Sequence, residues 1–148
     1  MAERSAQVTW QGDLMSGSGE IHEVPSGAFG PLQVTWASRA EDDQGDKTSP
    51  EELLAAAHAG CYATSLAGEL TQAGSPPEQL DITSNVVMDE VAGEGHVIVE
   101  SQLRVRARVA GIDEESFRRI AAEADAGCPF SKLIKASAKV SIDAELEG

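Results

Sequence analysis

Aromatic residues are scarce in this chain of 148 residues, where Phe, Trp and Tyr together make up 4% of the sequence. Large flat side chains therefore cannot fill much of an interior, and close packing has to come from smaller apolar groups. We expect tight helix contacts built on alanine and glycine. The length suits one hydrophobic core, and we predict a single domain over residues 1–148.

Basic residues are also few, since 11 Lys and Arg stand against 25 Asp and Glu and give a formal net charge of −14. Nucleic-acid binding needs clustered cations that replace counterions along the phosphates. The acidity therefore argues against a DNA or RNA partner, and it favours solubility instead.

Long hydrophobic runs are absent. The longest, Leu53 to Gly68, is interrupted by His58, Thr64 and Ser65 and falls short of the ~20 residues that a membrane-spanning helix needs. It predicts a buried helix. The polar stretch Met1 to Ser5 shows no apolar core of a secretory signal. We expect a cytoplasmic protein with no membrane partner.

Cysteine is limited to Cys61 and Cys128, which lie 67 positions apart and so exclude a Cys-x-x-Cys motif. In a reducing compartment a disulfide between them would be transient and chemical in purpose. Cys61 lies in the apolar helix, where a cysteine by itself is most simply a small core residue. Cys128 precedes Pro129 at a predicted helix start, where free amides and the helix dipole favour a thiolate. Spacing alone leaves open whether the two thiols meet.

Alternation of apolar and polar residues predicts half-buried strands. The predicted strands are Ala6–Trp10, a short one at Glu20–Val24, one containing Leu32, Val34 and Trp36, and then Leu80–Asp89, His96–Val109 and Ala138–Leu146.

Three helices are predicted between these strands. The first has a strong start signal, with Ser49 as N-cap, Pro50 at the first position and Glu52 completing a capping box, and we expect it to end near Ala73. The others span Asp113 to Ala126 and the segment that follows Cys128.

The order of elements indicates an α+β protein with mainly antiparallel pairing rather than repeated βαβ units. The sequence has no Gly-x-Gly-x-x-Gly after a strand and no phosphate-binding loop ending in Gly-Lys-Ser/Thr, which argues against a nucleotide site.

Two segments resemble the signatures of the OsmC (osmotically inducible protein C) and organic hydroperoxide resistance family. Ser49 to Cys61 reads SPEELLAAAHAGC, and Ala126 to Lys132 reads AGCPFSK. They occur in the family's order and spacing, and similarity extends over nearly the whole chain. Gly60 and Tyr62 replace the alanine and phenylalanine that are common in the family, and neither change removes a reactive group.

The resemblance implies an OsmC-like fold, with antiparallel sheets around a long buried central helix in an intertwined homodimer. It implies a thiol peroxidase that reduces organic hydroperoxides and hydrogen peroxide in oxidative or osmotic stress defence. Cys61 would be the peroxidatic thiol and Cys128 the resolving thiol. An external thiol or dithiol, such as a lipoyl group, would reopen their disulfide. No cofactor and no metal are implied.

The resemblance also implies an arginine and a glutamate that position and activate the first thiol. Glu51 matches the glutamate, but it precedes Cys61 by ten residues, roughly 15 Å along a helix, so an arginine has to bridge toward the sulfur. The resemblance implies Arg39, which stands ahead of the Glu51 loop at the position of the OsmC branch. The hydroperoxide-resistance branch carries its arginine earlier, and the absence of an arginine between Arg4 and Arg39 favours the OsmC branch. Without the resemblance, Arg39 is simply a surface cation near the acidic loop at 41–43. The subunit that supplies it stays open.

Two alternatives remain. His58 lies one turn before Cys61 and is a candidate base, or a zinc ligand with both cysteines and His22 or His96, although the usual paired ligand spacings are missing. We favour a packed or hydrogen-bonded core histidine. The alternative function is a non-enzymatic protein that binds a small hydrophobic ligand while its cysteines stay inert.

Overall fold

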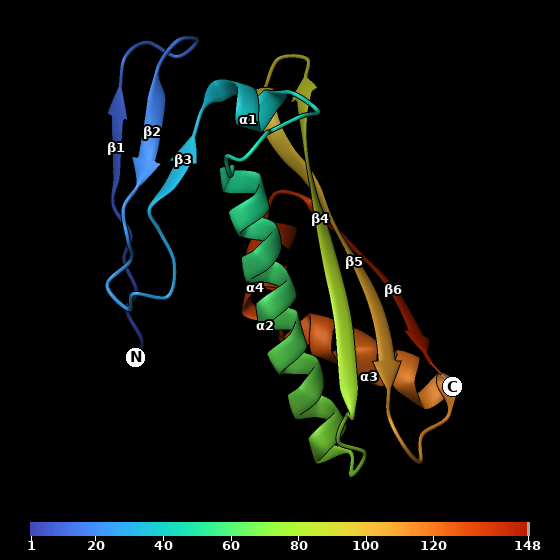
Figure 1. The fold of residues 1–148 in the computed structure, drawn as a ribbon. Coiled ribbons are helices and arrows are strands. Elements are labelled where there is room, and N and C mark those ends of the chain that lie inside the picture. The colour runs from blue at the N-terminus through green and yellow to red at the C-terminus, as the bar shows by residue number, and fades with distance from the viewer. Residues whose placement is uncertain (148) are drawn as a thin grey trace. The chain divides into compact units, whose positions relative to one another are not determined.

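The computed structural model describes residues 1–147, which divide into two compact units (Figure 1). The first comprises Met1–Leu53 and the second begins at Leu54. Among the described residues, no helix combines the length and the hydropathy that crossing a membrane requires.

The first unit contains a three-stranded antiparallel sheet of β1 (Val8–Gln11), β2 (Ser18–Ile21) and β3 (Leu32–Val34), in that order. The three strands are confirmed within a few residues of the predicted bounds. All four residues of β1 are exposed in the single chain, including Trp10 at 40%. The prediction of a half-buried strand there is therefore wrong for this chain taken alone.

A short helix, α1 (Trp36–Ala40), was not predicted. Trp36 follows Leu32 and Val34 at every second position, so the sequence pattern predicted that it belongs to the strand. Local hydrogen bonds override that pattern. The Ser38 amide donates to the Thr35 hydroxyl, and the Thr35 amide donates to the Ser38 hydroxyl, at 3.1 and 2.9 Å. This reciprocal capping box starts a helix directly after the strand.

The predicted central helix is α2 (Pro50–Gln72). The predicted Ser49 N-cap is confirmed, with the Glu52 amide donating to the Ser49 hydroxyl at 3.1 Å. The Glu52 carboxylate accepts a further hydrogen bond from the Thr48 hydroxyl, at 2.8 Å.

Burial along α2 follows a single stripe at every fourth position, His58, Tyr62, Leu66 and Leu70. Small residues such as Gly60 lie outside this stripe and are exposed. The expected buried helix is therefore buried along this stripe, and other positions of α2 are exposed in the single chain.

The second unit contains a sheet in which β5 (Gly95–Arg108) is central. It pairs antiparallel with β4 (Gln79–Val91) and parallel with β6 (Lys139–Leu146). The helices α3 (Glu114–Gly127) and α4 (Pro129–Lys135) form the crossover between β5 and β6. Antiparallel pairs predominate, as predicted, and the α+β fold class is confirmed.

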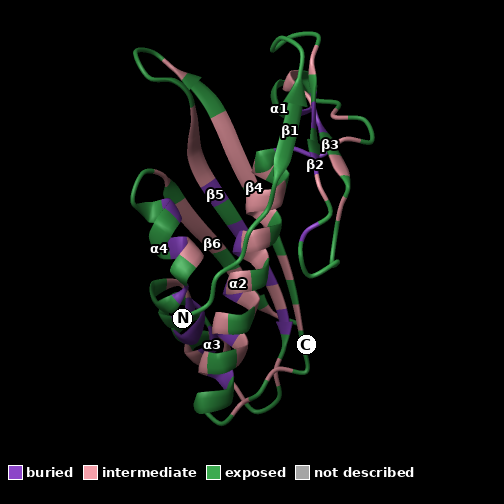
Figure 2. Ribbon diagram, turned by 90° about the vertical axis from the view of Figure 1, so that its left-hand side faces the viewer, coloured by how far each residue is buried: buried purple, intermediate pink, exposed green. Residues whose placement is uncertain are grey.

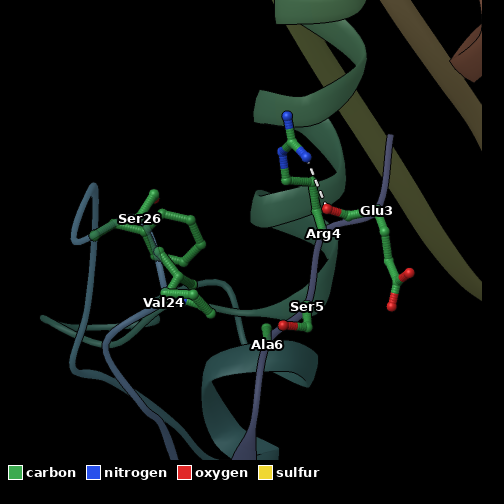
Figure 3. A pocket seen from close by; sticks show the side chains of 8 residues that line it. Glu3, Arg4, Ser5, Ala6, Val24 and Ser26 are labelled. Carbon is green, nitrogen blue, oxygen red and sulfur yellow. Dashed lines mark hydrogen bonds between the residues drawn. The ribbon is translucent and has the colours of Figure 1, made fainter. Parts of the chain in front are cut away.

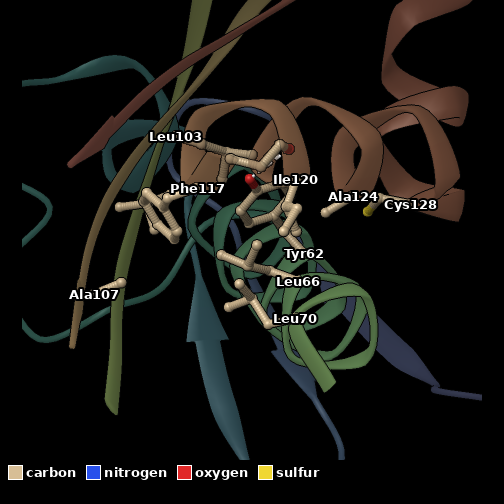
Figure 4. Close-up of a cluster of buried hydrophobic side chains, with 11 residues drawn as sticks. Tyr62, Leu66, Leu70, Leu103, Ala107, Phe117, Ile120, Ala124 and Cys128 are labelled. Carbon is tan, nitrogen blue, oxygen red and sulfur yellow. Dashed lines mark hydrogen bonds between the residues drawn. The ribbon is translucent and has the colours of Figure 1, made fainter. Parts of the chain in front are cut away.

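The core of the second unit lies between this sheet and the helices (Figure 4). Tyr62 and Phe117 are among its largest members, and both are fully buried. The expectation of a core made of small side chains is thus wrong, because Tyr62 and Phe117 are buried there together with three leucines. Figure 2 shows the buried stripes on α3 and β5. The cluster comprises Tyr62, Leu66, Leu70, Leu103, Val105, Ala107, Phe117, Ile120, Ala121, Ala124 and Cys128.

Candidate active site

The two cysteines come together at one end of this core. Cys61 projects from the middle of α2, and Cys128 is the N-cap of α4. Their sulfurs lie 3.3 Å apart, and both are free thiols. A disulfide bond is about 2.05 Å long, so a local movement of roughly an ångström would join them.

The two thiols differ in access and in acidity. Cys61 is partly exposed, whereas Cys128 is fully buried. Burial raises the pKa of the Cys61 thiol, and the neighbouring Cys128 raises it further, against a hydrogen bond from the Phe130 amide. Within this chain Cys61 is therefore mainly a thiol at neutral pH.

Cys128 responds in the opposite direction. Burial alone would raise its pKa, but the amide and hydroxyl of Ser131, the Cys61 thiol and the Phe130 amide all act on its sulfur and together lower the pKa. Sulfur is only a weak hydrogen-bond acceptor, and the Cys128 side chain makes no capping hydrogen bond of the kind that an N-cap oxygen makes. The prediction that this helix start favours a thiolate at Cys128 is confirmed in direction.

His58 lies one turn before Cys61 and has no exposed surface. Its Nδ1 is 2.7 Å from the Ser101 hydroxyl and its Nε2 is 2.8 Å from the Ser131 hydroxyl. Burial lowers the pKa of His58, so the imidazole is neutral at neutral pH. The interpretation as a hydrogen-bonded core histidine is confirmed.

The geometry argues against a zinc site at His58, because both ring nitrogens already contact serine hydroxyls. Within residues 1–147, no three His, Cys, Asp or Glu side chains converge as a metal site would require.

Arg39 and Glu51 pair within the first unit. The guanidinium makes two hydrogen bonds to the carboxylate, from Nη2 to Oε1 at 2.7 Å and from Nε to Oε2 at 3.3 Å. The guanidinium carbon also lies 5.9 Å from the centre of the Trp36 ring, within the range of a cation–π contact. Glu51 is the less exposed partner, at 12% of its side chain against 35% for Arg39. The bidentate pair fixes the direction in which the cation points.

A family model described as OsmC-like protein matches residues 43–143 of this sequence. The chain belongs to the OsmC-like family. The resemblance inferred from the two cysteine segments is thereby confirmed.

Relatives match along most of this OsmC-like chain. Peroxiredoxin OsmC of Escherichia coli strain K12 is 35% identical over 144 residues, which cover 97% of this chain and 96% of that protein. The organic hydroperoxide resistance protein of Xanthomonas axonopodis pv. citri is 27% identical over 99 residues, covering 66% and 67%.

Solved structures confirm the OsmC-like fold. The organic hydroperoxide resistance protein OhrB of Bacillus subtilis superposes with a TM-score of 0.72 at 21% identity, covering 95% of this chain and 98% of that one. An organic hydroperoxide resistance protein from Elizabethkingia anophelis superposes with a TM-score of 0.75 at 17% identity, and the match covers 99% of this chain and 99% of that one.

Ser101 and Ser131 were missed as site residues of this OsmC-like protein. Ser131 occurs in the second signature and stands three positions after the N-cap Cys128, where a polar residue commonly caps a helix. The position of Ser131 could therefore have suggested an interaction with the N-cap residue Cys128. Ser101 offers no such signal, because it lies within a strand and meets His58 only through the fold.

A cavity of about 480 Å³ opens in the first unit of this OsmC-like chain (Figure 3). Arg4 is one of the residues that line it, and its guanidinium donates to the Glu3 carbonyl at 2.7 Å. The lining includes neither cysteine, so this cavity is separate from the thiol pair. Its lining residues are Glu3, Arg4, Ser5, Ala6, Val24, Pro25, Ser26 and Phe29.

Proposed function

We propose that this protein is a thiol-dependent peroxidase that reduces organic hydroperoxides, and hydrogen peroxide less readily, through Cys61 and Cys128. The observation that carries the proposal is the 3.3 Å separation of the two sulfurs. Relatives named peroxiredoxin and organic hydroperoxide resistance protein support the same chemistry.

In the first step the Cys61 thiolate attacks the distal oxygen of the peroxide. A sulfur–oxygen bond forms as the oxygen–oxygen bond breaks, and the alkoxide leaves with a proton as an alcohol. Cys61 becomes a sulfenic acid, so the sulfur has lost two electrons to the peroxide.

In the second step the Cys128 thiolate attacks the Cys61 sulfur and expels hydroxide, which takes up a proton to give water. The new sulfur–sulfur bond is the transient disulfide. An external thiol or dithiol then supplies two electrons and reopens it by exchange. A lipoyl group is one dithiol of this kind, and the cytoplasm is the reducing compartment that we propose.

The difference in solvent exposure supports the order in which the two thiols react. Cys128 is the more acidic group but is fully buried, whereas Cys61 is partly exposed and open to a peroxide. A thiolate that is buried and adjacent suits the resolving role, because its target is the neighbouring sulfur rather than a molecule from solution.

Cys61 needs a cation to become a thiolate, because burial raises its pKa. We propose that Arg39, oriented by Glu51, is that cation in an intertwined homodimer. Two observations support a homodimer, namely the exposed apolar residues of β1 and the exposed small-residue side of α2. Family membership supports it as well.

The test is to add one equivalent of an alkyl hydroperoxide to the reduced protein and follow it by intact-mass and peptide mass spectrometry. We expect the loss of two hydrogens and a Cys61–Cys128 cross-linked peptide. Two unmodified thiols would refute the peroxidase.

Unmodified thiols would instead favour the alternative of a protein that binds a small hydrophobic ligand. The cavity beside Val24 and Phe29 is the observation in its favour. That alternative predicts slow and equal alkylation of the two cysteines, whereas the peroxidase predicts that Cys61 reacts first.

A further inference from the structure

A buried hydrogen bond joins the two helices that hold the thiols. Nε2 of His58 on α2 lies 2.8 Å from the Ser131 hydroxyl on α4. His58 precedes Cys61 by three positions, and Ser131 follows Cys128 by three. This hydrogen bond and the 3.3 Å contact of the two sulfurs are therefore neighbouring links between α2 and α4, about one helical turn apart. We refer to the contact of His58 with Ser131 as the α2–α4 bridge.

The bridge is anchored on the sheet. Nδ1 of His58 lies 2.7 Å from the Ser101 hydroxyl on β5, and the Ser101 oxygen lies 3.1 Å from that of Ser84 on β4. His58, Ser101 and Ser131 are all 0% exposed, so water does not compete for these hydrogen bonds. A serine hydroxyl both donates and accepts, so the bridge forms with either tautomer of the neutral ring. The strand β5 thus fixes the place of the bridge.

The two ends of α4 are held by different partners. Lys135, its last residue, forms an ion pair with Asp125 on α3. Ser131 lies in the first turn of α4 and contacts His58 on α2. The start of α4, where Cys128 is the N-cap, is therefore tied to the helix of Cys61 by a contact that involves no sulfur.

The separation of the two sulfurs is a near-attack distance. Reacting atoms held about 3–3.5 Å apart react much faster than freely diffusing ones, because the entropy of bringing them together is lost before the reaction starts. The Cys61 and Cys128 sulfurs, at 3.3 Å, fall within this range. A movement of α4 against α2 by about an ångström would take them out of it. A contact that prevents this movement favours the disulfide.

We propose that His58 is a positioning residue for disulfide formation, and that its hydrogen bond to Ser131 holds Cys128 at near-attack distance from Cys61. The bridge then raises the effective concentration of one thiol at the other. Because coupling between two contacts is reciprocal, disulfide formation also strengthens the bridge. The inference deepens the proposed function and rests on it for its purpose, which is to let Cys128 reach the sulfenic acid before a second peroxide does.

The test measures the equilibrium of the protein with mixtures of reduced and oxidised glutathione. The Cys61–Cys128 bond forms as the sulfur–sulfur bond of glutathione disulfide breaks, and the two protein thiols pass their two electrons and two protons to two departing glutathione thiols. The mixture at which half of the protein is oxidised gives the effective concentration. Samples are quenched with acid, alkylated and counted by intact mass, and thermal unfolding shows whether each variant is folded.

Two substitutions of His58 separate the bridge from the other contact of the ring. Counted in bonds from Cβ, the amide of asparagine stands at the place of Nδ1 and the amide of glutamine at that of Nε2. His58→Asn should keep the contact with Ser101 and lose the bridge, and should lower the effective concentration on the order of tenfold, the effect of one hydrogen bond. His58→Gln should lose Ser101, keep the bridge and stay near the wild-type value.

Ser131→Ala removes the bridge from its other side and should give the same shift as His58→Asn. The double variant should show no larger shift, because both changes break one hydrogen bond. The matched control is Ser84→Ala, which removes a serine hydroxyl from the sheet end of the same hydrogen-bonded group and should leave the equilibrium unchanged. If His58→Asn does not fold, Ser131→Ala against Ser84→Ala decides the test.

The equilibrium is measured below and above the titration midpoint of Cys128. Positioning predicts the shift at both pH values, whereas a change in thiol acidity shifts the equilibrium only where the thiolate is populated. The proposal is overturned by equal effects of His58→Asn and His58→Gln, or by a shift confined to the higher pH. It is also overturned if Ser131→Ala shifts the equilibrium much further than His58→Asn, because Ser131 then acts on the sulfur without His58.

Failure of this inference is distinguishable from failure of the proposed function, because the glutathione equilibrium uses no peroxide. The expected shifts in a protein that does not reduce peroxides would refute the peroxidase alone. Peroxide turnover together with an unshifted equilibrium in His58→Asn would refute the α2–α4 bridge alone.

Discussion

Cys61 and Cys128 lie 3.3 Å apart yet occupy different environments, one partly exposed with a raised pKa and the other buried with a lowered pKa. Cys61→Ser should therefore abolish peroxide turnover. Cys128→Ser should permit one oxidation, after which excess peroxide carries Cys61 on to the sulfinic acid, because no resolving thiol intercepts the sulfenic acid. Turnover assays and intact-mass spectrometry check both outcomes, and wild-type turnover by both variants would contradict the mechanism.

Arg39 is held by two hydrogen bonds from its guanidinium to the Glu51 carboxylate. Arg39→Met should lower kcat/KM for an alkyl hydroperoxide on the order of a hundredfold, the usual effect of removing one preorganised donor from a reacting centre. Arg118→Met is the matched control, because Arg118 is exposed and pairs with Glu114 on the same helix. Equal activities of Arg39→Met and Arg118→Met would show that Arg39 does not act in the active site.

His58 predicts a pH dependence of stability. Its pKa is lowered in the folded protein from 6.5, so the unfolded chain binds a proton that the native protein does not bind between the lowered value and 6.5. The free energy of unfolding should therefore fall as the pH drops through this window. Urea titrations at several pH values should show this slope in the wild type.

The same slope should be missing in His58→Gln. The carboxylates with lowered pKa values, such as Asp113 and Asp143, titrate at lower pH and are common to both proteins, so they cancel in the comparison. Identical slopes in the two proteins would mean that His58 does not titrate on unfolding as the structure requires.

At the scale of elements, the start of α2 is the best-specified helix end in the chain. The Ser49 hydroxyl accepts from the Glu52 amide and is itself buried. Ser49→Ala should lower the free energy of unfolding by about 1 kcal/mol, whereas Ser49→Asp should retain most of it. Urea denaturation gives both values.

The matched control on the same helix is Thr71→Ala, since Thr71 is exposed and lies away from the cap. Its effect should stay within about 0.5 kcal/mol. A loss from Ser49→Ala no larger than that of Thr71→Ala would show that this cap does not stabilise α2.

The elements that were predicted correctly are those in which local and long-range preferences agree. The alternation of Leu103, Val105 and Ala107 is confirmed, because one face of β5 is buried against the core. At Trp36 the alternation of apolar residues predicts a continued strand, whereas the local hydrogen bonds favour a helix. The capping box of Thr35 and Ser38 ends the strand there. The parallel pairing of β5 with β6 depends on the α3–α4 crossover, and strand periodicity carries no information about strand direction.

At the scale of the whole molecule, the exposed β1 and the open side of α2 belong to a chain that we propose to be a homodimer. Sedimentation should give twice the chain mass of 15.5 kDa. Mixing and refolding Arg39→Met with Cys61→Ser should recover activity if the arginine acts across the interface, because each mixed dimer then contains one intact site.

With random assortment the recovered activity should be about a quarter of the wild-type activity per chain. Each variant refolded alone is the control: Cys61→Ser should be inactive, and Arg39→Met should keep about a hundredth of the wild-type activity. We expect recovery; a mixture as inactive as its components would place Arg39 and Cys61 of one site in the same subunit.

Sequence alone determined the order of the major helices and strands, the capped start of α2, the helix-start position of Cys128 and the OsmC-like family. These features depend on neighbours within a few residues or on motifs whose residues are contiguous. The roles of Cys61, Cys128, Arg39 and Glu51 stay predictions that the resemblance carries.

Only the tertiary structure decided which distant residues meet. Cys61 and Cys128 are 67 positions apart and become neighbours because α2 and α4 both pack at one end of the core. His58 finds Ser101 and Ser131 in the same way, on a strand and a helix far along the chain. The acidity of each thiol follows from these contacts, because burial and hydrogen bonds to sulfur are properties of the packed structure and not of local sequence.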